Sequence, residues 1–216
     1  MITGWFARIL NDEDDMQVLD ELASGEDAVE FVKHHAPDVV LLDARMPGMG
    51  GIEATHSLIK ISPHIRIIVM SSITKGIIPS QMLRAGAKAF ITKCVRVEEL
   101  LKAIRMVHAG QHYVTPEVAT QLALDPFNQK EDSLFEKLSR REMQIAQMLT
   151  DGKKVSQIAQ YLKLSPKTVY SYSYRIFEKL GIRSDVELTI LAVKHGLADD
   201  PRELDQLLNR IDRAAS

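Results

Sequence analysis

The amino-acid sequence predicts an α/β domain built on a parallel sheet, followed by a separate all-helical domain. In the first half, short apolar runs alternate with helical patterns, which is typical of a parallel sheet with helices on both faces. Beyond about residue 133 the strand signal disappears and only helical patterns remain. A chain of 216 residues has room for two domains of ordinary size.

Three apolar runs define the strands of the first domain. They read DVVLLD at 38–43, IRIIVM at 65–70 and AFIT at 89–92. Continuous β-branched and leucine runs of this kind form strands that are covered on both faces. Apolar residues with the spacing of a helix occur before, between and after these runs, and they predict helices at 26–35, 51–60, 81–85 and 97–109.

The second half begins with a brief predicted helix from Pro116 to Leu124. The polar segment that follows lacks periodicity, so we expect an interdomain linker over 125–134 and a helical domain over 135–198. The helices of that domain are predicted at 139–150, 155–163, 166–180 and 185–196. An extra helix over 199–216 has an apolar face that we expect to pack on this domain or on a second copy; the face consists of Leu204, Leu207, Leu208 and Ile211.

Composition narrows the class of protein. With 45% hydrophobic and 26% charged residues, the chain has the balance of a soluble globular protein. It has no apolar run near the 20 residues a bilayer requires and no signal-peptide pattern, so we expect a cytoplasmic protein without a membrane partner. The single cysteine, Cys94, excludes an internal disulfide, and the histidines have no metal-ligand spacing.

Charge is distributed unevenly along the chain. Residues 138–196 carry a net charge of +5 and the remainder carries −7, which gives the total of −2. A compact basic segment on an acidic chain is the electrostatic pattern of a nucleic-acid-binding domain.

The helices at 155–163 and 166–180 are separated by two residues. Ser165 is placed to cap the second helix, and Pro166 fits its first position. One stripe of this helix is predicted to pack on the preceding helix and consists of Val169, Tyr172, Ile176 and Leu180. This is the layout of a helix-turn-helix, whose second helix enters the major groove of double-stranded DNA.

The other side of that helix carries the candidate DNA-binding residues. We assign phosphate contacts to Lys167, Thr168 and the amides at the helix start, which Ser165 caps. Base contacts are assigned to Tyr170, Ser171 and Tyr174, with Arg175 at the flank.

Together with LSRREMQIAQMLTDG at 138–152, this region resembles the DNA-binding domain of the LuxR/FixJ/NarL type. The positions that match the family pattern are Leu138, Ser139, Arg141, Glu142, Gly152, Ile158, Ala159, Leu162, Ser165, Lys167, Thr168, Val169, Ile176, Lys179 and Leu180. Relatives of this type carry Arg where this chain has Ser173, so we expect operator preference or affinity to differ.

In the first domain, polar side chains follow three predicted strands. Asp43 ends the first, Ser71 follows the second and Lys93 follows the third, so all three meet at the carboxyl edge of a parallel sheet. Pro47, Gly48 and Gly50 allow backbone to approach closely there. An acid, a hydroxyl and an ammonium suit phosphoryl transfer to Asp43, with Ser71 and Lys93 holding the phosphate.

The segments PDVVLLDARMPGMGGIEAT and RAGAKAFITK resemble the flavodoxin-like receiver of two-component response regulators, in particular the GacA/UvrY/LetA subgroup. The resemblance implies a transcription regulator whose Asp43 accepts phosphate from a sensor histidine kinase. It also implies Mg²⁺ at Asp43, rearrangement of Ser71 and Phe90, and promoter binding as a homodimer.

The sequence departs from the receiver pattern at its start. MITGWFARIL matches only the tail of the first receiver helix, so we expect the receiver over 1–124 to lack its first strand and acidic pair. Asp43 alone leaves an incomplete Mg²⁺ site. The sheet should be interrupted between a strand near Met16 to Leu19 and the strand at 38–43. NDEDD at 11–15 is interpreted as a solvated turn rather than the acidic pair.

Two explanations of this departure stay open, a misplaced start and a degenerate receiver that no longer accepts phosphate. The alternative functions are accordingly a phosphorylation-independent regulator and an interaction protein that pairs with an intact regulator. DNA binding of equal strength with and without acetyl phosphate would favour the phosphorylation-independent regulator. An enzyme ranks last, because the sequence has no Gly-rich phosphate loop and no nucleophile–base–acid set.

Overall fold

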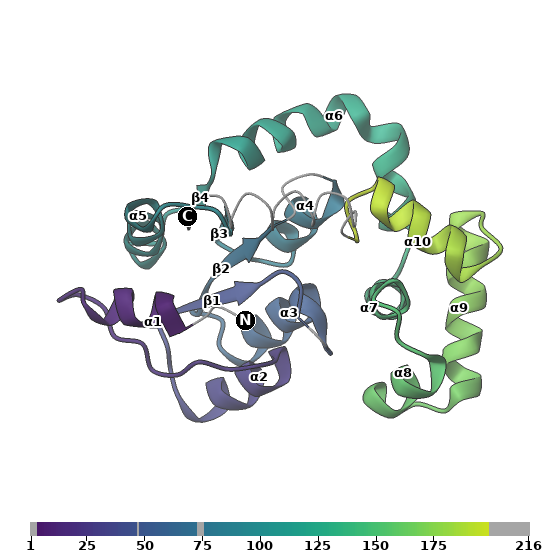
Figure 1. The fold of residues 1–216 in the computed structure, drawn as a ribbon, viewed down its shortest axis with the longest axis horizontal. Helices are drawn as coiled ribbons and strands as arrows, with labels where there is room; N and C mark the ends of the chain where they lie inside the picture. The colour runs from purple at the N-terminus through teal and green to yellow at the C-terminus, as the bar shows by residue number, and fades with distance from the viewer. Residues whose placement is uncertain (1–3, 47, 73–75, 199–216) are drawn as a thin grey trace, which may run out of the picture. The chain divides into compact units, whose positions relative to one another are not determined.

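The computed structural model describes residues 4–46, 48–72 and 76–198 (Figure 1). Pro47 and the helix predicted over 199–216 therefore lie outside the described residues. The chain divides into two compact units, one formed by Met1–Thr74 and Ile78–Asn128 and the other by Lys75–Ile77 and Gln129–Ser216. Within the described ranges, no helix is long and apolar enough to cross a bilayer.

The first unit contains a four-stranded parallel sheet with the strands in sequence order. The strands are β1 (Val39–Asp43), β2 (Arg66–Ser71), β3 (Ala89–Thr92) and β4 (Tyr113–Val114). The three predicted strands are confirmed to within one residue. Strand β4 was not predicted, because two residues are too few to show a periodicity.

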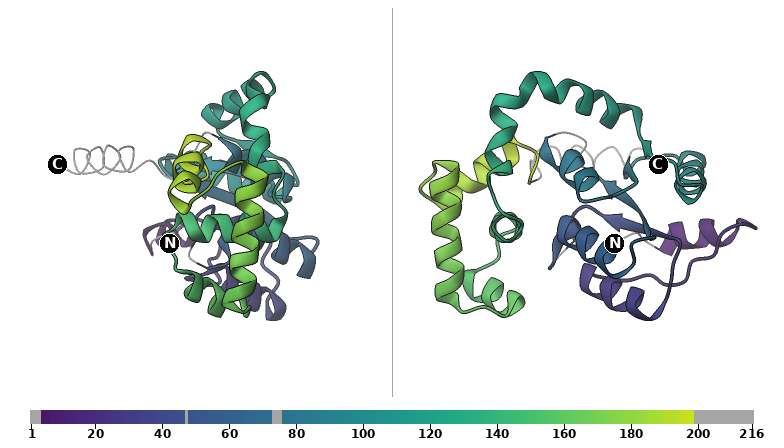
Figure 2. Two further views of the ribbon diagram at one scale, coloured as in Figure 1. Left: turned by 90° about the vertical axis from the view of Figure 1, so that its right-hand side faces the viewer. Right: turned by 180° about the vertical axis from the view of Figure 1, so that it is seen from behind.

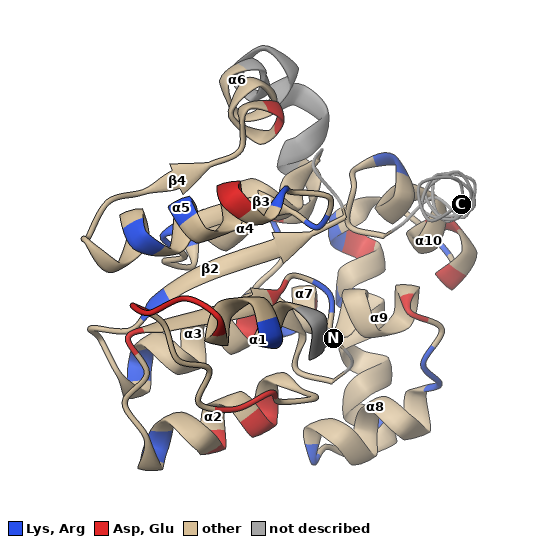
Figure 3. Cartoon of the chain, turned by 60° about the vertical axis from the view of Figure 1, so that its left-hand side comes forward, with Lys and Arg blue, Asp and Glu red and all other residues tan. Residues whose placement is uncertain are grey.

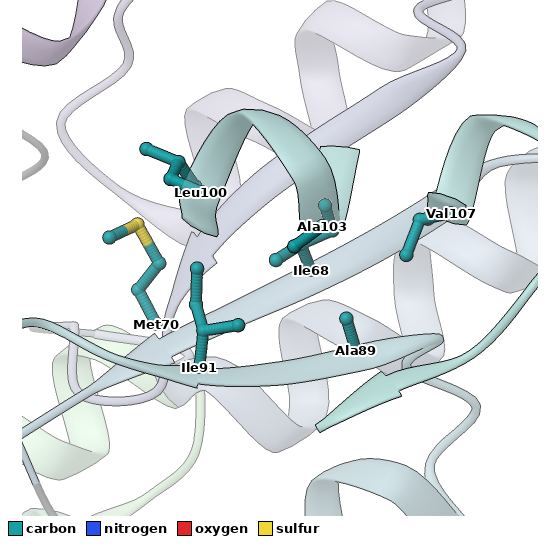
Figure 4. Packing of buried hydrophobic residues seen from close by; sticks show 7 residues of the cluster. All are labelled: Ile68, Met70, Ala89, Ile91, Leu100, Ala103 and Val107. Atoms are coloured by element: carbon teal, nitrogen blue, oxygen red, sulfur yellow. The ribbon is translucent and has the colours of Figure 1, made fainter. Parts of the chain in front are cut away.

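Helices cover both faces of this sheet (Figure 1). They are α1 (Gly4–Asn11), α2 (Gly25–His34), α3 (Gly50–Ile61), α4 (Ile77–Arg84) and α5 (Val97–His108). Figure 4 shows α5 on one face, where its apolar side chains contact strands β2 and β3. The residues in this contact are Leu100, Ala103 and Val107 on the helix, and Ile68, Met70, Ala89 and Ile91 on the strands.

The segment between α1 and α2 differs in part from expectation. The strand implied near Met16 to Leu19 is not formed, since residues 16–22 have no regular secondary structure. A strand needs a neighbouring strand to pair its backbone groups, and among the described residues nothing pairs with this segment. Strand β1 pairs only with β2 in the described part of the chain, so the expected interruption of the sheet lies beside β1.

The acidic segment at 11–15 forms a turn, as predicted (Figure 3). Its carboxylates bind the C-terminal half of α5: Arg105 donates to Asp15 at 2.7 and 2.8 Å and to Glu13 at 2.7 Å. The hydrogen bond from Arg105 holds the pKa of Asp15 below its usual value. Helix α5 runs back toward the amino ends of the strands, where His108 lies 4.0 Å from Asp38. These carboxylates are therefore at the opposite edge of the sheet from Asp43.

Helix α6 (Pro116–Glu136) corrects the prediction of a brief helix that ends at Leu124. The helix continues through 125–134 although that segment lacks apolar periodicity. The segment contains the helix formers Gln129, Lys130 and Glu131, but it also contains Pro126, which disfavours a helix interior, so helix propensity does not account for the continuation. The boundary between the two units falls inside it, between Asn128 and Gln129.

The second unit contains the four helices that the sequence predicts after residue 138. They are α7 (Arg140–Thr150), α8 (Val155–Leu162), α9 (Pro166–Leu180) and α10 (Asp185–Lys194). Helix α9 packs against α7 and α8, and α10 packs against α7 (Figure 2). Ile145, Ile158 and Ile176 are completely buried between them. Burial of these side chains fixes the helix-turn-helix formed by α8 and α9.

Candidate functional site

The carboxyl ends of β1, β2 and β3 bring the predicted phosphoacceptor residues together. Asp43 is the last residue of β1 and lies opposite Met70, one residue before Ser71 ends β2. Ser71 in turn pairs with Thr92, and the backbone N–H of Lys93 donates to the carbonyl of Ser71 at 2.9 Å. The parallel register thus places an acid, a hydroxyl and an ammonium at one edge.

The Asp43 carboxylate is held on both oxygens. The ammonium of Lys93 lies 2.6 Å from its Oδ2, and the backbone N–H of Arg45 donates to its Oδ1 at 2.9 Å. Asp43 is only 5% exposed, whereas 37% of the Lys93 side chain is exposed. The carboxylate is therefore oriented by the protein, and its cationic partner is accessible from solvent.

The turn after Asp43 depends on Gly51, a residue that our sequence interpretation missed. A Cβ at this position would lie 2.6 Å from the carbonyl oxygen of Ala44 and 2.9 Å from that of Asp43. Only glycine lets α3 begin so close to the end of β1. Gly48 and Gly50 adopt positive φ angles of 92° and 73°, as the predicted close turn requires. The signal for Gly51 was its position directly after Gly50.

Phe90 lies in the middle of β3 and is fully buried. Its neighbours Ala89 and Ile91 face α5, so the alternation of a strand directs Phe90 to the other face of the sheet. There it lies next to Val69 of β2, which precedes Ser71 by two residues. The structure places Phe90 beside the strand that carries Ser71, and its proposed switching role stays a prediction.

The described residues do not complete a Mg²⁺ site around Asp43. Mg²⁺ prefers octahedral oxygen coordination that includes one or two carboxylates. Within the described part of the chain, no three His, Cys, Asp or Glu side chains cluster as metal ligands would. Glu13 and Asp15 are engaged by Arg105 at the opposite edge of the sheet, so they cannot supply the acidic pair.

In the second unit, side-chain caps fix the start of α9. Ser165 Oγ accepts a hydrogen bond from the backbone N–H of Thr168 at 3.1 Å and lies 2.8 Å from Thr168 Oγ1. Pro166 occupies the first helical turn, as predicted. Lys167 is exposed and Thr168 is half-buried at this end of the helix. The helix start therefore presents the exposed Lys167 cation, a group that binds phosphate, whereas the backbone N–H of Thr168 is already bonded to Ser165.

Two tyrosines dominate the exposed side of α9. Tyr170 is 62% exposed and Tyr174 is 80% exposed. Ser171 is exposed as well, but its hydroxyl donates to the carbonyl of Lys167 at 3.0 Å. The guanidinium of Arg175 lies 5.5 Å from the centre of the Tyr172 ring, a cation–π distance that orients it. All the predicted DNA-binding residues except Thr168 are exposed.

The buried side of α9 differs from prediction at two positions. Val169, Ile176 and Leu180 are buried as expected, whereas Tyr172 is only half-buried. Ser173 takes its place in the buried stripe at 7% exposure and donates to the carbonyl of Val169 at 3.2 Å. Its direction toward the core means that any influence of Ser173 on operator preference would act through packing.

An ion pair locks α9 to α7. Ser139 and Glu142 form a reciprocal capping box at the start of α7, and Lys179 of α9 lies 2.6 Å from Glu142 Oε2. Burial by itself raises the pKa of the Glu142 carboxyl, but the hydrogen bonds from Lys179 and Ser139 outweigh it and lower the pKa below the ordinary 4.5. Glu142 and Lys179 were recognised only as matches to a family pattern. The structure assigns both to positioning the exposed helix.

Comparison with known protein families covers both units. Residues 2–105 match the family described as the response regulator receiver domain, and residues 136–192 match the bacterial regulatory proteins of the luxR family. The response regulator GacA of Pseudomonas aeruginosa is 47% identical over 200 residues, which cover 92% of this chain and 94% of GacA. The response regulator UvrY of Escherichia coli K12 is 42% identical over 200 residues, 92% of each chain.

Solved structures agree with this fold. RcsB of Salmonella typhimurium matches with a TM-score of 0.66 and 21% identity over 89% of this chain and 92% of its own. A LuxR-family two-component response regulator from Aurantimonas matches with a TM-score of 0.55 and 27% identity over 57% of this chain and 89% of its own. Both structures are described as response regulators.

The capping-box carboxylate provides a stability test. We expect Glu142→Gln to lower the free energy of unfolding by about 1–2 kcal/mol, because a buried charge-assisted hydrogen bond is weakened. Since the pKa is lowered in the folded state, this contribution is present above pH 4.5 and is lost as the pH falls through the folded-state pKa. Urea unfolding of the parent chain and of Glu142→Gln, from pH 7 to pH 3, measures the difference in their free energies of unfolding.

Glu178→Gln is the control, since Glu178 is an exposed carboxylate on α9, next to the Lys179 that pairs with Glu142. It should change stability by less than about 0.5 kcal/mol. A Glu142→Gln effect that stayed constant down to pH 3 would contradict the assigned role of the carboxylate.

Proposed function

The chain belongs to the response regulators of the luxR family, and on that premise we propose that phosphorylation of Asp43 by a sensor histidine kinase controls its binding to promoters. The family consists of DNA-binding transcription regulators, not enzymes. The observation that carries the proposal is the pairing of Asp43 with Lys93 at the carboxyl edge of the sheet, 2.6 Å apart.

In the proposed reaction, a carboxylate oxygen of Asp43 attacks the phosphorus of a phosphohistidine on the kinase. The new O–P bond forms as the P–N bond breaks, and the imidazole leaves. Lys93 then pairs with phosphoryl oxygens, and the Ser71 hydroxyl donates to another. The backbone N–H of Arg45 supports this role, because it fixes the other carboxylate oxygen at 2.9 Å.

The proposed signal passes from Ser71 to Phe90. Movement of Ser71 toward a phosphoryl group would shift the end of β2, and Phe90 lies against that strand beside Val69. Because Phe90 is fully buried, it can change position only if the packing around it rearranges. Such a two-state rearrangement suits a switch.

For DNA binding, we propose that α9 enters the major groove. Lys167, Thr168 and the amides at the helix start would contact phosphates, and Arg175 would contact the DNA backbone at the flank. Tyr170, Ser171 and Tyr174 would face the bases. Their exposure on one side of a helix whose other side is buried supports this assignment.

The exposed side of α10 is the proposed contact surface of a homodimer. Val186 and Ile190 are one helical turn apart and are 68% and 58% exposed, whereas Leu188 and Ala192 on the other side are buried. An exposed apolar pair on a short helix favours contact with another protein surface. A second copy would bring a second α9 to the same DNA.

The alternative is a phosphorylation-independent regulator or a heterodimerising interaction protein. The observation that favours it is the absence of a carboxylate cluster for Mg²⁺ among the described residues. Without such a cluster, phosphoryl transfer would lose its usual charge neutralisation.

Phosphorylation is tested by intact-mass spectrometry after incubation with acetyl phosphate and Mg²⁺. We expect one phosphoryl adduct on the 216-residue chain and none on Asp43→Asn. Lys93→Ala should retain the acceptor but give less adduct, because the ammonium that pairs with the phosphate is lost. Complete absence of adduct on the unmodified chain would favour the phosphorylation-independent alternative.

The phosphate contact is tested through salt dependence. We expect Lys167→Ala to weaken binding to all duplexes similarly and to reduce the slope of log K against log salt by about one. Lys102→Ala is the control, since Lys102 is an exposed lysine on α5. An unchanged slope for Lys167→Ala would exclude the assigned contact.

The dimer surface is tested by analytical ultracentrifugation of the chain treated with acetyl phosphate. We expect Val186→Asp to weaken self-association at least about tenfold, because two copies would bury unpaired carboxylates. Leu19→Asp is the matched control, an exposed apolar residue of the first unit at 53% exposure. If Val186→Asp and Leu19→Asp self-associate equally strongly, α10 does not form the dimer contact.

A further inference from the structure

The exposed side of α9 carries two tyrosine side chains that extend into solvent. Tyr170 and Tyr174 are spaced by four residues, so their rings lie on the same side of the helix one turn apart. At 62% and 80% exposure, they leave more of their rings in water than a packed aromatic does. Each ring ends in a hydroxyl but offers a largely apolar edge.

The other side chains of this helix half have little capacity to read base edges. The hydroxyl of Ser171 is used by the carbonyl of Lys167, and those of Ser165 and Thr168 lie 2.8 Å from each other. Residues 166–174 contain no Asn, Gln or Arg. These side chains and lysine make two-point hydrogen bonds to adenine or guanine, and the one lysine of this segment, Lys167, is assigned to a phosphate contact.

We infer that Tyr170 and Tyr174 select DNA by contacting thymine methyl groups in the major groove. Thymine is the one unmodified base with a methyl group there, and apolar side chains recognise it by contact. The tyrosine hydroxyls add single hydrogen bonds, which position the rings but discriminate weakly. The inference rests on the proposed placement of α9 in the groove and names the chemical group that it reads.

The experiment replaces individual thymines by deoxyuridine, which differs only by the missing methyl. A duplex is first selected from a random pool by the full chain in the presence of acetyl phosphate and Mg²⁺. Each thymine of the selected duplex is then replaced in turn, and the dissociation constant is measured by fluorescence anisotropy at one fixed salt concentration.

For the unmodified chain, we expect about fourfold weaker binding at each contacted thymine, which corresponds to about 0.8 kcal/mol for one buried methyl-sized group. Tyr170→Phe and Tyr174→Phe keep the ring and should keep this sensitivity. Tyr170→Ser and Tyr174→Ser should each abolish it at their own subset of positions. Both residues are exposed, so these variants should fold as the parent does.

Three results would overturn the inference. If deoxyuridine has no effect at any position while binding stays salt-dependent, α9 binds DNA without reading methyl groups. If the Ser variants keep the sensitivity, other residues read the methyl groups. If the Ser variants change only the association state, the rings contact protein. Failure to select any duplex would instead remove the proposed DNA contact of α9 together with this inference.

Discussion

The parallel register of the sheet is the constraint on which the first unit depends. Because β1, β2 and β3 run in the same direction, residues far apart in the sequence end at one edge, and Lys93 reaches Asp43 across 50 positions of the chain. The pair also spans the width of β2, whose last residue is Ser71. Any disturbance of the register would separate the acid from its cation and would remove the site as a whole.

The sheet fixes Asp43 from the side of β2, and specific contacts fix its carboxylate. In the described part of the chain, β1 has one neighbouring strand, and Val39, Val40 and Leu41 are only half-buried although their sequence is typical of a doubly covered strand. Among the described residues, the ladder therefore fixes this strand from one side, along its full length. The ammonium of Lys93 and the amide of Arg45 compensate at its end, and the absent side chain of Gly51 lets α3 close against it.

The sequence was sufficient to predict the main strands, the four helices of the second unit and the position of Asp43 and Lys93 at one edge of the sheet, because each rests on local periodicity or on a cap. Ser165 illustrates this, since its capping role needs only its neighbours. The sequence did not predict features that depend on contacts between residues far apart in the chain. The binding of Arg105 to the acidic turn joins residues about 90 positions apart, and the burial of Ser173 depends on the rotation of α9 against α7. Helix α6 continues through Pro126 without an apolar period, which neither periodicity nor helix propensity predicts.

In the second unit, the candidate binding residues are positioned by a single helix rather than by the register of several strands. Its exposed groups lie on one helix, so their mutual spacing is set by the helix itself, and the remaining freedom is the rotation of α9 about its axis. Val169, Ile176 and Leu180 fix that rotation by burial, and Lys179 fixes the C-terminal end through Glu142. Because the capped start and the locked end are independent, Tyr170 and Tyr174 can differ in chemistry without disturbing the core. The proposed DNA recognition can therefore change by substitution on this side alone, whereas the proposed acceptor site depends on residues from three strands whose register must be kept.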